Sequence, residues 1–200
     1  QLDNSVTVGF VMDSDKSLTV SFGPFVTVDP GGDYPSIRWA IDDVPDGTVI
    51  VVSPVATWVE PGYGPPIQMN GKNVLVTSVD PYDRAVVEQT IIDATPRGDT
   101  PPESTRHFDF SGTEDSACIL RGLHLINGTY KDSVGGAILG NGTGATIEYC
   151  LIENNEAKVK SEDPLSGFSA GGAIYDVDGD IRGNIIRNNY ISSNKWGIWI

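Results

Sequence analysis

The sharpest cluster of side chains with chemical potential is an alternating run of aspartates, Asp176, Asp178 and Asp180. Alternating carboxylates can present several oxygen atoms to Ca²⁺, which takes oxygen ligands. The run is not an EF-hand loop, because Gly179 stands at the wrong position and no glutamate follows at the required distance. A solvated acidic turn is therefore favoured, and a calcium site formed by the three aspartates is the alternative.

Three tryptophans, Trp58, Trp196 and Trp199, are candidates for binding sugar rings. An exposed aromatic face complements the C–H groups of a pyranose. Trp199 alternates with Ile198 and Ile200, so it faces outward if the two isoleucines point into a core. We interpret the three tryptophans as ligand-binding residues for a polysaccharide or a cell-surface glycan, with burial under a neighbouring loop as the alternative.

No complete catalytic set accompanies these residues. Glycoside hydrolysis needs two carboxyl groups about 5 to 10 Å apart on one face. Suitable carboxylates are present without any pair standing out: Glu153, Glu156, Asp176 and Asp178. His107 and His124 are interpreted as packed side chains, and the sequence holds no serine-hydrolase, zinc-protease or phosphate-loop motif. The sequence therefore leaves open whether the protein is an enzyme.

The overall charge and composition exclude some partners. The 27 Asp and Glu residues outnumber the 13 Lys and Arg residues and give a net charge of -14, which repels phosphate backbones. Nucleic acid is therefore not expected as a partner. No apolar run approaches the roughly 18 residues that a membrane span needs. The 23 glycines and 13 prolines indicate a turn-rich β protein.

A repeat in the last third of the chain predicts the elements that position these residues. Residues 120–127, 147–154 and 181–188 align with one another without gaps, and Gly-Gly-Ala-Ile recurs at 135–138 and 171–174. Self-similarity of this kind is typical of a solenoid. Because the units are short Ile- and Val-rich strands broken by Gly and Asn, they predict a parallel β-helix and exclude leucine-rich or helical repeats.

Two details of the repeat predict its turns. Asn127, Asn154 and Asn188 occupy equivalent positions, where Asn tolerates a left-handed backbone and its amide can bond the amides of neighbouring units. We therefore predict a column formed by these three amides. The glycine pairs allow a tight bend, after which Ala137 and Ile138 turn inward.

The segment before the repeat predicts a short helix and several strands. Ser36 can cap a helix that extends through Val44, in which Ile37, Ala40 and Ile41 share one apolar face. Continuous apolar strands, typical of parallel sheets, are predicted at 48–54, 72–78 and 90–93.

The first residues of the chain resemble part of another module. Residues 5–22 contain two alternating runs around a polar turn, which predicts a hairpin. The stretch from Met12 to Phe22 resembles the last two strands of the β-rich repeat of internalins, which stands in tandem on bacterial surface proteins. The resemblance implies that residues 1–24 are the C-terminal hairpin of a preceding surface-repeat module. A hairpin that caps the following domain is the alternative.

A second resemblance rests on four segments, 34–41, 46–52, 71–78 and 119–128. Through them, residues 25–200 resemble the N-terminal part of the right-handed parallel β-helix family related to pectate lyases. The resemblance implies an amphipathic helix that plugs one end of the solenoid, and it weakens at 55–60, where family members commonly show a Gly-Thr-Tyr turn. In such enzymes Ca²⁺ bridges acidic side chains and substrate carboxylates while an Arg or Lys abstracts a proton. No residue of this chain matches a catalytic motif of the family.

Together these features predict an all-β, right-handed parallel β-helix solenoid with a short N-terminal capping helix, which continues into further rungs after Ile200. As function we predict a modular protein, extracellular or on a bacterial cell surface, that binds or processes polysaccharide on a lyase-like or hydrolase-like scaffold. The alternative is a non-catalytic adhesin or structural stalk, which needs no clustered titrating groups. Ca²⁺ is the cofactor that the acidic run suggests.

Overall fold

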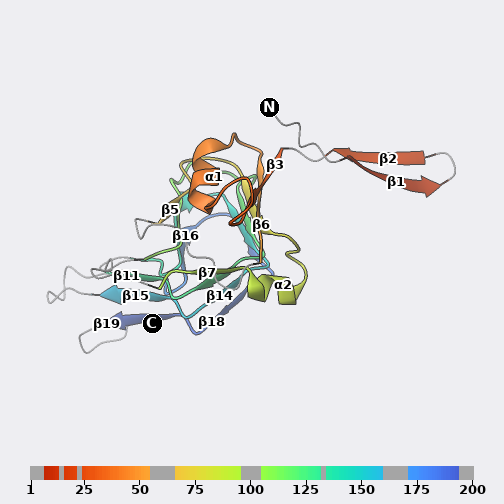
Figure 1. The fold of residues 1–200 in the computed structure, drawn as a ribbon. Coiled ribbons are helices and arrows are strands. Elements are labelled where there is room, and N and C mark those ends of the chain that lie inside the picture. The colour runs from red at the N-terminus through yellow and green to blue at the C-terminus, as the bar shows by residue number, and fades with distance from the viewer. Residues whose placement is uncertain are drawn as a thin grey trace.

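The computed structural model describes residues 7–13, 16–21, 24–54, 66–95, 105–131, 134–159 and 171–193. Near the N-terminus, β1 (Thr7–Asp13) and β2 (Lys16–Ser21) pair antiparallel and form a two-stranded sheet of their own (Figure 1). The predicted hairpin is therefore confirmed. Its assignment to a preceding surface module stays a prediction.

The other described strands pair in parallel and form four sheets, which we number I to IV. Sheet I contains, in spatial order, β3 (Phe25–Val28), β4 (Val49–Val52), β6 (Leu75–Ser78), β9 (Ile119–Arg121), β13 (Thr146–Glu148) and β17 (Ile181–Arg182). Sheet II contains β7 (Ile91–Asp93), β10 (His124–Ile126), β14 (Leu151–Glu153) and β18 (Ile185–Arg187). Sheet III contains β11 (Thr129–Lys131), β15 (Glu156–Val159) and β19 (Tyr190–Ser193). Sheet IV contains β5 (Ile67–Gln68), β8 (Phe108–Asp109), β12 (Ile138–Thr143) and β16 (Ile174–Val177).

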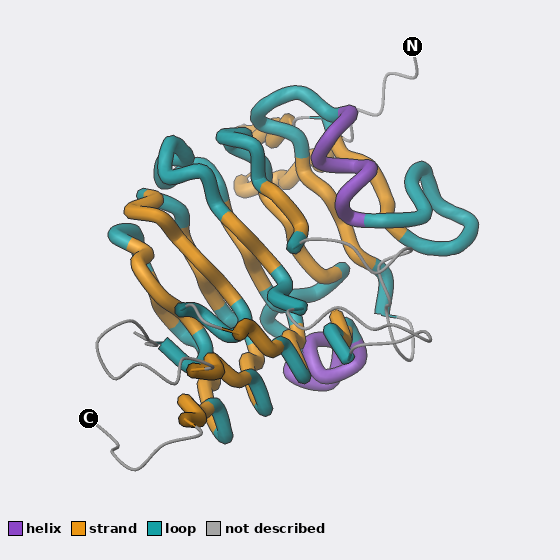
Figure 2. The backbone as a smooth tube through the Cα atoms, turned by 90° about the vertical axis from the view of Figure 1, so that its left-hand side faces the viewer, coloured by secondary structure: helices purple, strands orange, loops and turns teal. Residues whose placement is uncertain are grey.

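The order of the strands reproduces the sequence repeat. From β9 onward the chain adds one strand to sheets I, II, III and IV in turn and then begins again at sheet I. Ile147 pairs with Leu120 on one side and with Ile181 on the other, which is the register that the repeat predicts. Figure 2 shows the resulting strands lying side by side. The all-β class and the parallel pairing are thus confirmed.

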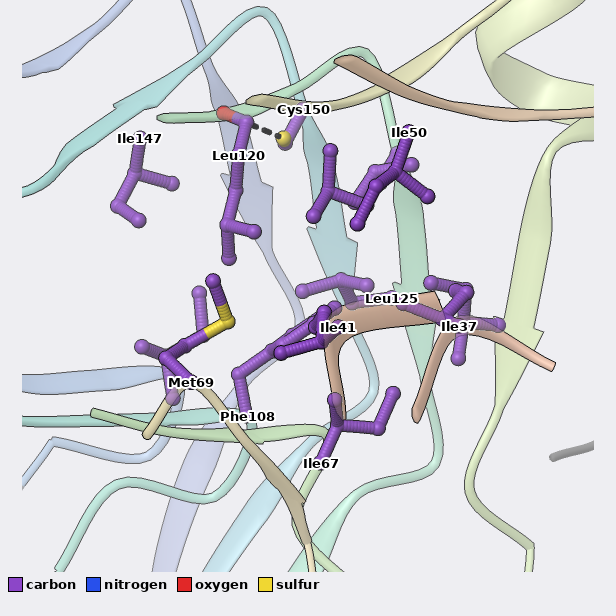
Figure 3. Close-up of a cluster of buried hydrophobic side chains, with 14 of the residues drawn as sticks. Ile37, Ile41, Ile50, Ile67, Met69, Phe108, Leu120, Leu125, Ile147 and Cys150 are labelled. Carbon is purple, nitrogen blue, oxygen red and sulfur yellow. Dashed lines mark hydrogen bonds between the residues drawn. The ribbon is translucent and has the colours of Figure 1, made fainter. Parts of the chain in front are cut away.

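The core lies between the sheets, because alternate side chains of the short strands point inward. Leu120, Ile147, Leu125 and Phe108 are fully buried and pack together in the cluster drawn in Figure 3. Burying one such side chain contributes roughly 1.5 to 3 kcal/mol. Ala137 and Ile138 are also buried, as the sequence predicts. The core therefore grows by a few apolar side chains with each repeat.

Both cysteines belong to this core. Cys118 and Cys150 are free and buried, and burial raises the pKa of each thiol to about 12. The Cys150 thiol lies 3.7 Å from the carbonyl oxygen of Leu120 (Figure 3). A thiol with so high a pKa is inert at neutral pH.

A short helix, α1 (Ile37–Asp43), packs against β3, β4 and β5 at one end of the stack (Figures 1 and 2). The Oγ of Ser36 accepts a hydrogen bond from the backbone N–H of Trp39 at 3.1 Å and caps the helix, as predicted. Ile37, Ala40 and Ile41 are fully buried. The helix thus covers apolar side chains that would otherwise be exposed at this end.

Lys72 fixes the C-terminal end of α1. Its ammonium group donates to the carbonyl oxygens of Ile41, Asp42 and Val44 at 2.6, 2.9 and 2.8 Å. These carbonyls include groups that a helix end leaves unpaired, so the lysine serves as a cap from a distant part of the chain. We expect Lys72→Met to lower the free energy of unfolding by about 2 kcal/mol, measured by urea denaturation.

Arg84→Met is the control for Lys72→Met. Arg84 forms an exposed ion pair with Glu88 within the second helix, α2 (Arg84–Gln89), and pairs of this kind contribute at most about 0.5 kcal/mol. Equal losses of stability in the two variants would show that Lys72 does not fix the helix end.

The asparagine column differs from the prediction by one residue. Asn127, Asn154 and Asn188 do have left-handed backbones, with φ of 62°, 58° and 55°. The stacked amides, however, belong to the residue that follows: the Nδ2 of Asn155 donates to the Oδ1 of Asn189 at 2.9 Å.

The direction of the side chains explains this correction. Asn154 and Asn188 are exposed, whereas Asn155 is fully buried and its Oδ1 accepts from the backbone N–H of Gly128 at 2.7 Å. At these two positions the left-handed residue makes the corner and faces outward, and the next side chain points back under the turn, where it can pair with the neighbouring repeat.

The first unit of the column differs. The Nδ2 of Asn127 donates to the Oδ1 of Asp93 at 2.9 Å, next to the strand pair of β10 and β7, and a glycine follows it. The predicted bond between neighbouring units is therefore made by Asn127 itself, but to an aspartate.

Candidate functional site

The aspartate run lies on the surface beside sheet IV. Asp176, Asp178 and Asp180 are all exposed, and the backbone of Asp176 is left-handed with φ of 60°. One carboxylate oxygen of Asp180 is 3.2 Å from the Nη1 of Arg182. Among the described residues, His, Cys, Asp and Glu side chains form no group of three or more that could hold a metal ion. Calcium binding by these aspartates stays a prediction.

The predicted sugar-binding tryptophans cannot be placed in the same way. Trp58, Trp196 and Trp199 lie outside the residues that the structure describes. Their role therefore stays a prediction, and the candidate site is built from other side chains.

A column of charged side chains crosses the outer face of sheet I. Arg121, Glu148 and Arg182 are register partners on β9, β13 and β17, next to the inward-facing column of Leu120 and Ile147. The Oε1 of Glu148 accepts from the Nε of Arg121, and its Oε2 accepts from the Nε of Arg182 at 2.7 Å. Both carboxylate oxygens are therefore engaged by guanidinium groups.

These contacts keep Glu148 ionised. Its side chain is only 2% exposed, and burial by itself raises the pKa of the carboxyl group. The hydrogen bonds from Arg182 and Arg121 outweigh burial and hold the pKa below its ordinary value. Glu148 is thus a bridge between two strands and cannot supply a proton near neutral pH.

A second polar cluster occupies the outer face of sheet II. Glu153 accepts from the Nε2 of His124 at 3.0 Å and from the Nε of Arg187 on β18. The Nδ1 of His124 faces the carbonyl oxygen of Glu88, at 3.2 Å, so the ring lies between α2 and β14. The hydrogen bond from Arg187 outweighs burial and, together with His124, holds the pKa of Glu153 below its ordinary value.

An aromatic pair lies beside the charged column. Tyr82, from the loop before α2, and Tyr149, which directly follows Glu148, meet edge to face with ring centroids 4.9 Å apart and planes at 71°. Tyr82 is 67% exposed and Tyr149 is 38% exposed. Large aromatic surfaces left open to solvent are candidates for ligand contact.

We call the set of Arg121, Glu148, Arg182, Tyr82 and Tyr149 the tyrosine–arginine face. It combines aromatic surface with guanidinium groups on stacked strands, an arrangement that suits binding of a hydroxyl-rich ligand. The carboxylates considered for catalysis do not gather on it. Glu156 lies on sheet III, where it pairs with Lys158 at 2.8 Å.

Sequence reasoning did not find this face, although the repeat contains a signal for it. Arg121, Glu148 and Arg182 occupy one repeat position with alternating charge, which predicts cross-strand ion pairs once the strands are known to be parallel. Tyr149 occupies a position held by Gly122 and Gly183 in the neighbouring units. A tyrosine in a column of glycines marks an exception to the repeat.

Comparison with known proteins does not assign the chain to a family: no family model, no curated protein and no solved structure matches it. Within the described residues, neither helix is long and apolar enough to cross a membrane.

Proposed function

We propose that the chain belongs to a modular bacterial protein, extracellular or attached to the cell surface, whose right-handed parallel β-helix binds polysaccharide. The β-helix is supported by parallel strands that enter four sheets in a repeating order and in constant register. The extracellular setting is supported by the resemblance of residues 1–24 to an internalin-type repeat.

The single observation that carries the binding function is the tyrosine–arginine face. Tyr82 and Tyr149 present aromatic surface to solvent, while Arg121 and Arg182 are fixed beside them by Glu148. A sugar ring needs both an apolar surface for its C–H groups and fixed polar groups for its hydroxyls. Strands in register hold these groups rigidly, so little ordering is needed on binding.

Binding is tested with a panel of polysaccharides and the whole chain, with and without Ca²⁺, together with assays for unsaturated and reducing products. We expect binding, and we expect Tyr82→Ala to weaken it about three- to tenfold, because one aromatic contact contributes roughly 0.5 to 1.5 kcal/mol. Isothermal titration calorimetry measures the change.

Trp39→Ala is the matched control. Trp39 is 56% exposed, but it lies on α1, which packs against β3, β4 and β5, away from β13 and β17. Its removal should leave the affinity unchanged. Failure of every polysaccharide in the panel to bind would refute the proposed function, and accumulation of product would identify an enzyme.

A non-catalytic stalk is the second candidate, and one observation favours it. Glu148 and Glu153 are both held in ion pairs that join successive strands. Charges arranged in this way stabilise the stack and leave no free acid or base among them. A stalk is expected to bind none of the polysaccharides, either as the unchanged protein or as the Tyr82→Ala variant.

A further inference from the structure

Tyr149 has a left-handed backbone at a repeat position that glycine occupies in the neighbouring units. The equivalent residues Gly122, Tyr149 and Gly183 have φ of 63°, 55° and 64°. Glycine enters this left-handed region without penalty, whereas a residue with a Cβ atom is strained there. Strain of this kind is typical of sites where a side chain has a role other than packing.

The flanking glycines make room for the tyrosine pair. A Cβ atom added to Gly183 would lie 2.8 Å from the Cε1 atom of Tyr149, so the Tyr149 ring rests against the backbone of Gly183. A Cβ atom added to Gly122 would lie 2.5 Å from the Cβ of Pro81, so the loop that carries Tyr82 rests against Gly122. The two rings are thereby seated next to each other over the strand ends, with part of their surface in solvent.

The charges beside the pair cancel. Arg121 and Arg182 donate through Nε to Glu148, and the Nη1 of Arg182 is 3.2 Å from Asp180. Two guanidinium groups therefore face two carboxylates, and the chain as a whole carries a net charge of -14. Neither the local nor the overall charge attracts a sugar that bears a carboxylate or a sulfate.

We propose that Tyr149 and Tyr82 form a subsite for an uncharged pyranose of a neutral polysaccharide. This inference rests on the proposed function and narrows it, since it selects neutral over acidic glycans. The aromatic pair contacts the C–H groups of the ring, and the terminal Nη groups of the arginines donate to its hydroxyl oxygens. Both carboxylate oxygens of Glu148 already accept hydrogen bonds from the arginines. The face therefore binds the sugar through hydrogen-bond donors.

The test compares neutral oligosaccharides, namely gluco-, manno- and xylo-oligosaccharides, with oligogalacturonate by isothermal titration calorimetry. Tyr149→Gly removes the ring and installs the residue that the repeat uses elsewhere, so the variant is expected to fold with an unchanged or higher urea midpoint. We expect it to bind the neutral ligand about tenfold more weakly, which corresponds to about 1.4 kcal/mol. Tyr149→Phe, which retains the ring, should lose less affinity than Tyr149→Gly.

Salt provides an independent measurement. Affinity for a neutral ligand should be nearly the same at 50 mM and 500 mM NaCl, because no charge is neutralised on binding. Binding of oligogalacturonate with steep salt dependence, or neutral binding that Tyr149→Gly leaves intact, would overturn the subsite while the proposed function stands. Absence of binding to all four ligands and to the polysaccharide panel would overturn both.

Discussion

Glu114→Ala is expected to lower the free energy of unfolding by about 4 kcal/mol. Glu114 is only 3% exposed, and its carboxylate accepts from the backbone N–H groups of Gly71, Ser111 and Gly112 at 2.9, 2.9 and 3.1 Å. It also lies 3.3 Å from the Oγ1 of Thr143. One side chain therefore joins turns from successive passes of the chain through sheet IV, and its removal leaves several donors unpaired.

The size of the expected stability loss follows from the charge of the Glu114 carboxylate, which accepts these hydrogen bonds. Hydrogen bonds to a charged group contribute about 1.5 to 3 kcal/mol each, and water would replace part of what is lost because Ser111 is exposed. Burial raises the pKa of Glu114, but the bonds from Ser111 and Gly71 contribute to a net pKa below the ordinary value. Its stabilisation is therefore present above about pH 4.5 and is lost as the pH falls further.

Urea denaturation at pH 7 measures the effect, with Glu88→Ala as the control. The Glu88 side chain is 53% exposed and forms an exposed ion pair with Arg84, so its loss should cost about 0.5 kcal/mol or less. Similar losses in the two variants would mean that the Glu114 carboxylate does not hold the turns together.

The strand register is the part of the fold that the sequence predicts best. Leu120, Ile147 and Ile181 align in the repeat and are paired in the sheet. Inward and outward side chains alternate, so a slip of one residue would turn the whole apolar set toward solvent. A gapless repeat of apolar positions therefore determines the pairing.

The turns are less predictable, because they depend on the direction of single side chains. The sequence identifies the corner at Asn154 but assigns the buried amide to that residue, whereas Asn155 holds it. Helix α2 is not among the elements that the sequence predicts. It has six residues, and its start is marked only by the Asp83 side chain, which accepts from the N–H of Ala85 at 2.8 Å.

The candidate site follows from neighbours that are distant in the sequence. The sequence predicts a site of tryptophans and aspartates, whereas the tyrosine–arginine face uses tyrosines and arginines. Tyr82 and Tyr149 meet only because the loop before α2 lies over Gly122. The repeat indicates which strands pair, but it does not indicate where an inserted loop will rest.

Acidification from pH 6.5 to pH 4 is expected to cost about 3 kcal/mol of stability through His107. Burial lowers the pKa of its imidazole to about 4, despite hydrogen bonds between its Nε2 and the carbonyl oxygens of Ile92 and Ile126, each at 3.0 Å. Because Nε2 faces two acceptors, it carries the proton and Nδ1 is the basic nitrogen. Nδ1 is buried and has no hydrogen-bond partner in the described part of the chain, so protonating it places an unpaired charge in the core.

Protonation of His107 in the unfolded and the folded state determines how stability changes with pH. The unfolded chain binds a proton at His107 near pH 6.5, whereas the folded protein does so only near pH 4. The contribution is therefore complete above pH 6.5, declines as the pH falls, and is exhausted below pH 4. Glu114, Glu148 and Glu153 lose their stabilising contributions only below about pH 4.5, since the pKa of each is held below its ordinary value.

His107→Gln isolates this contribution, because the amide can still donate to a carbonyl oxygen but does not titrate. Subtracting its unfolding free energies, measured in urea from pH 7 to pH 4, from those of the unchanged protein should reveal a loss of about 3 kcal/mol confined to that interval. His124→Gln leaves His107 intact, so this variant should still show the His107-dependent loss of stability as the pH falls. A His107→Gln variant that loses stability in parallel with the unchanged protein would show that the buried imidazole accepts a proton without cost, and the acid sensitivity would then have to come from the carboxylates that bridge the strands.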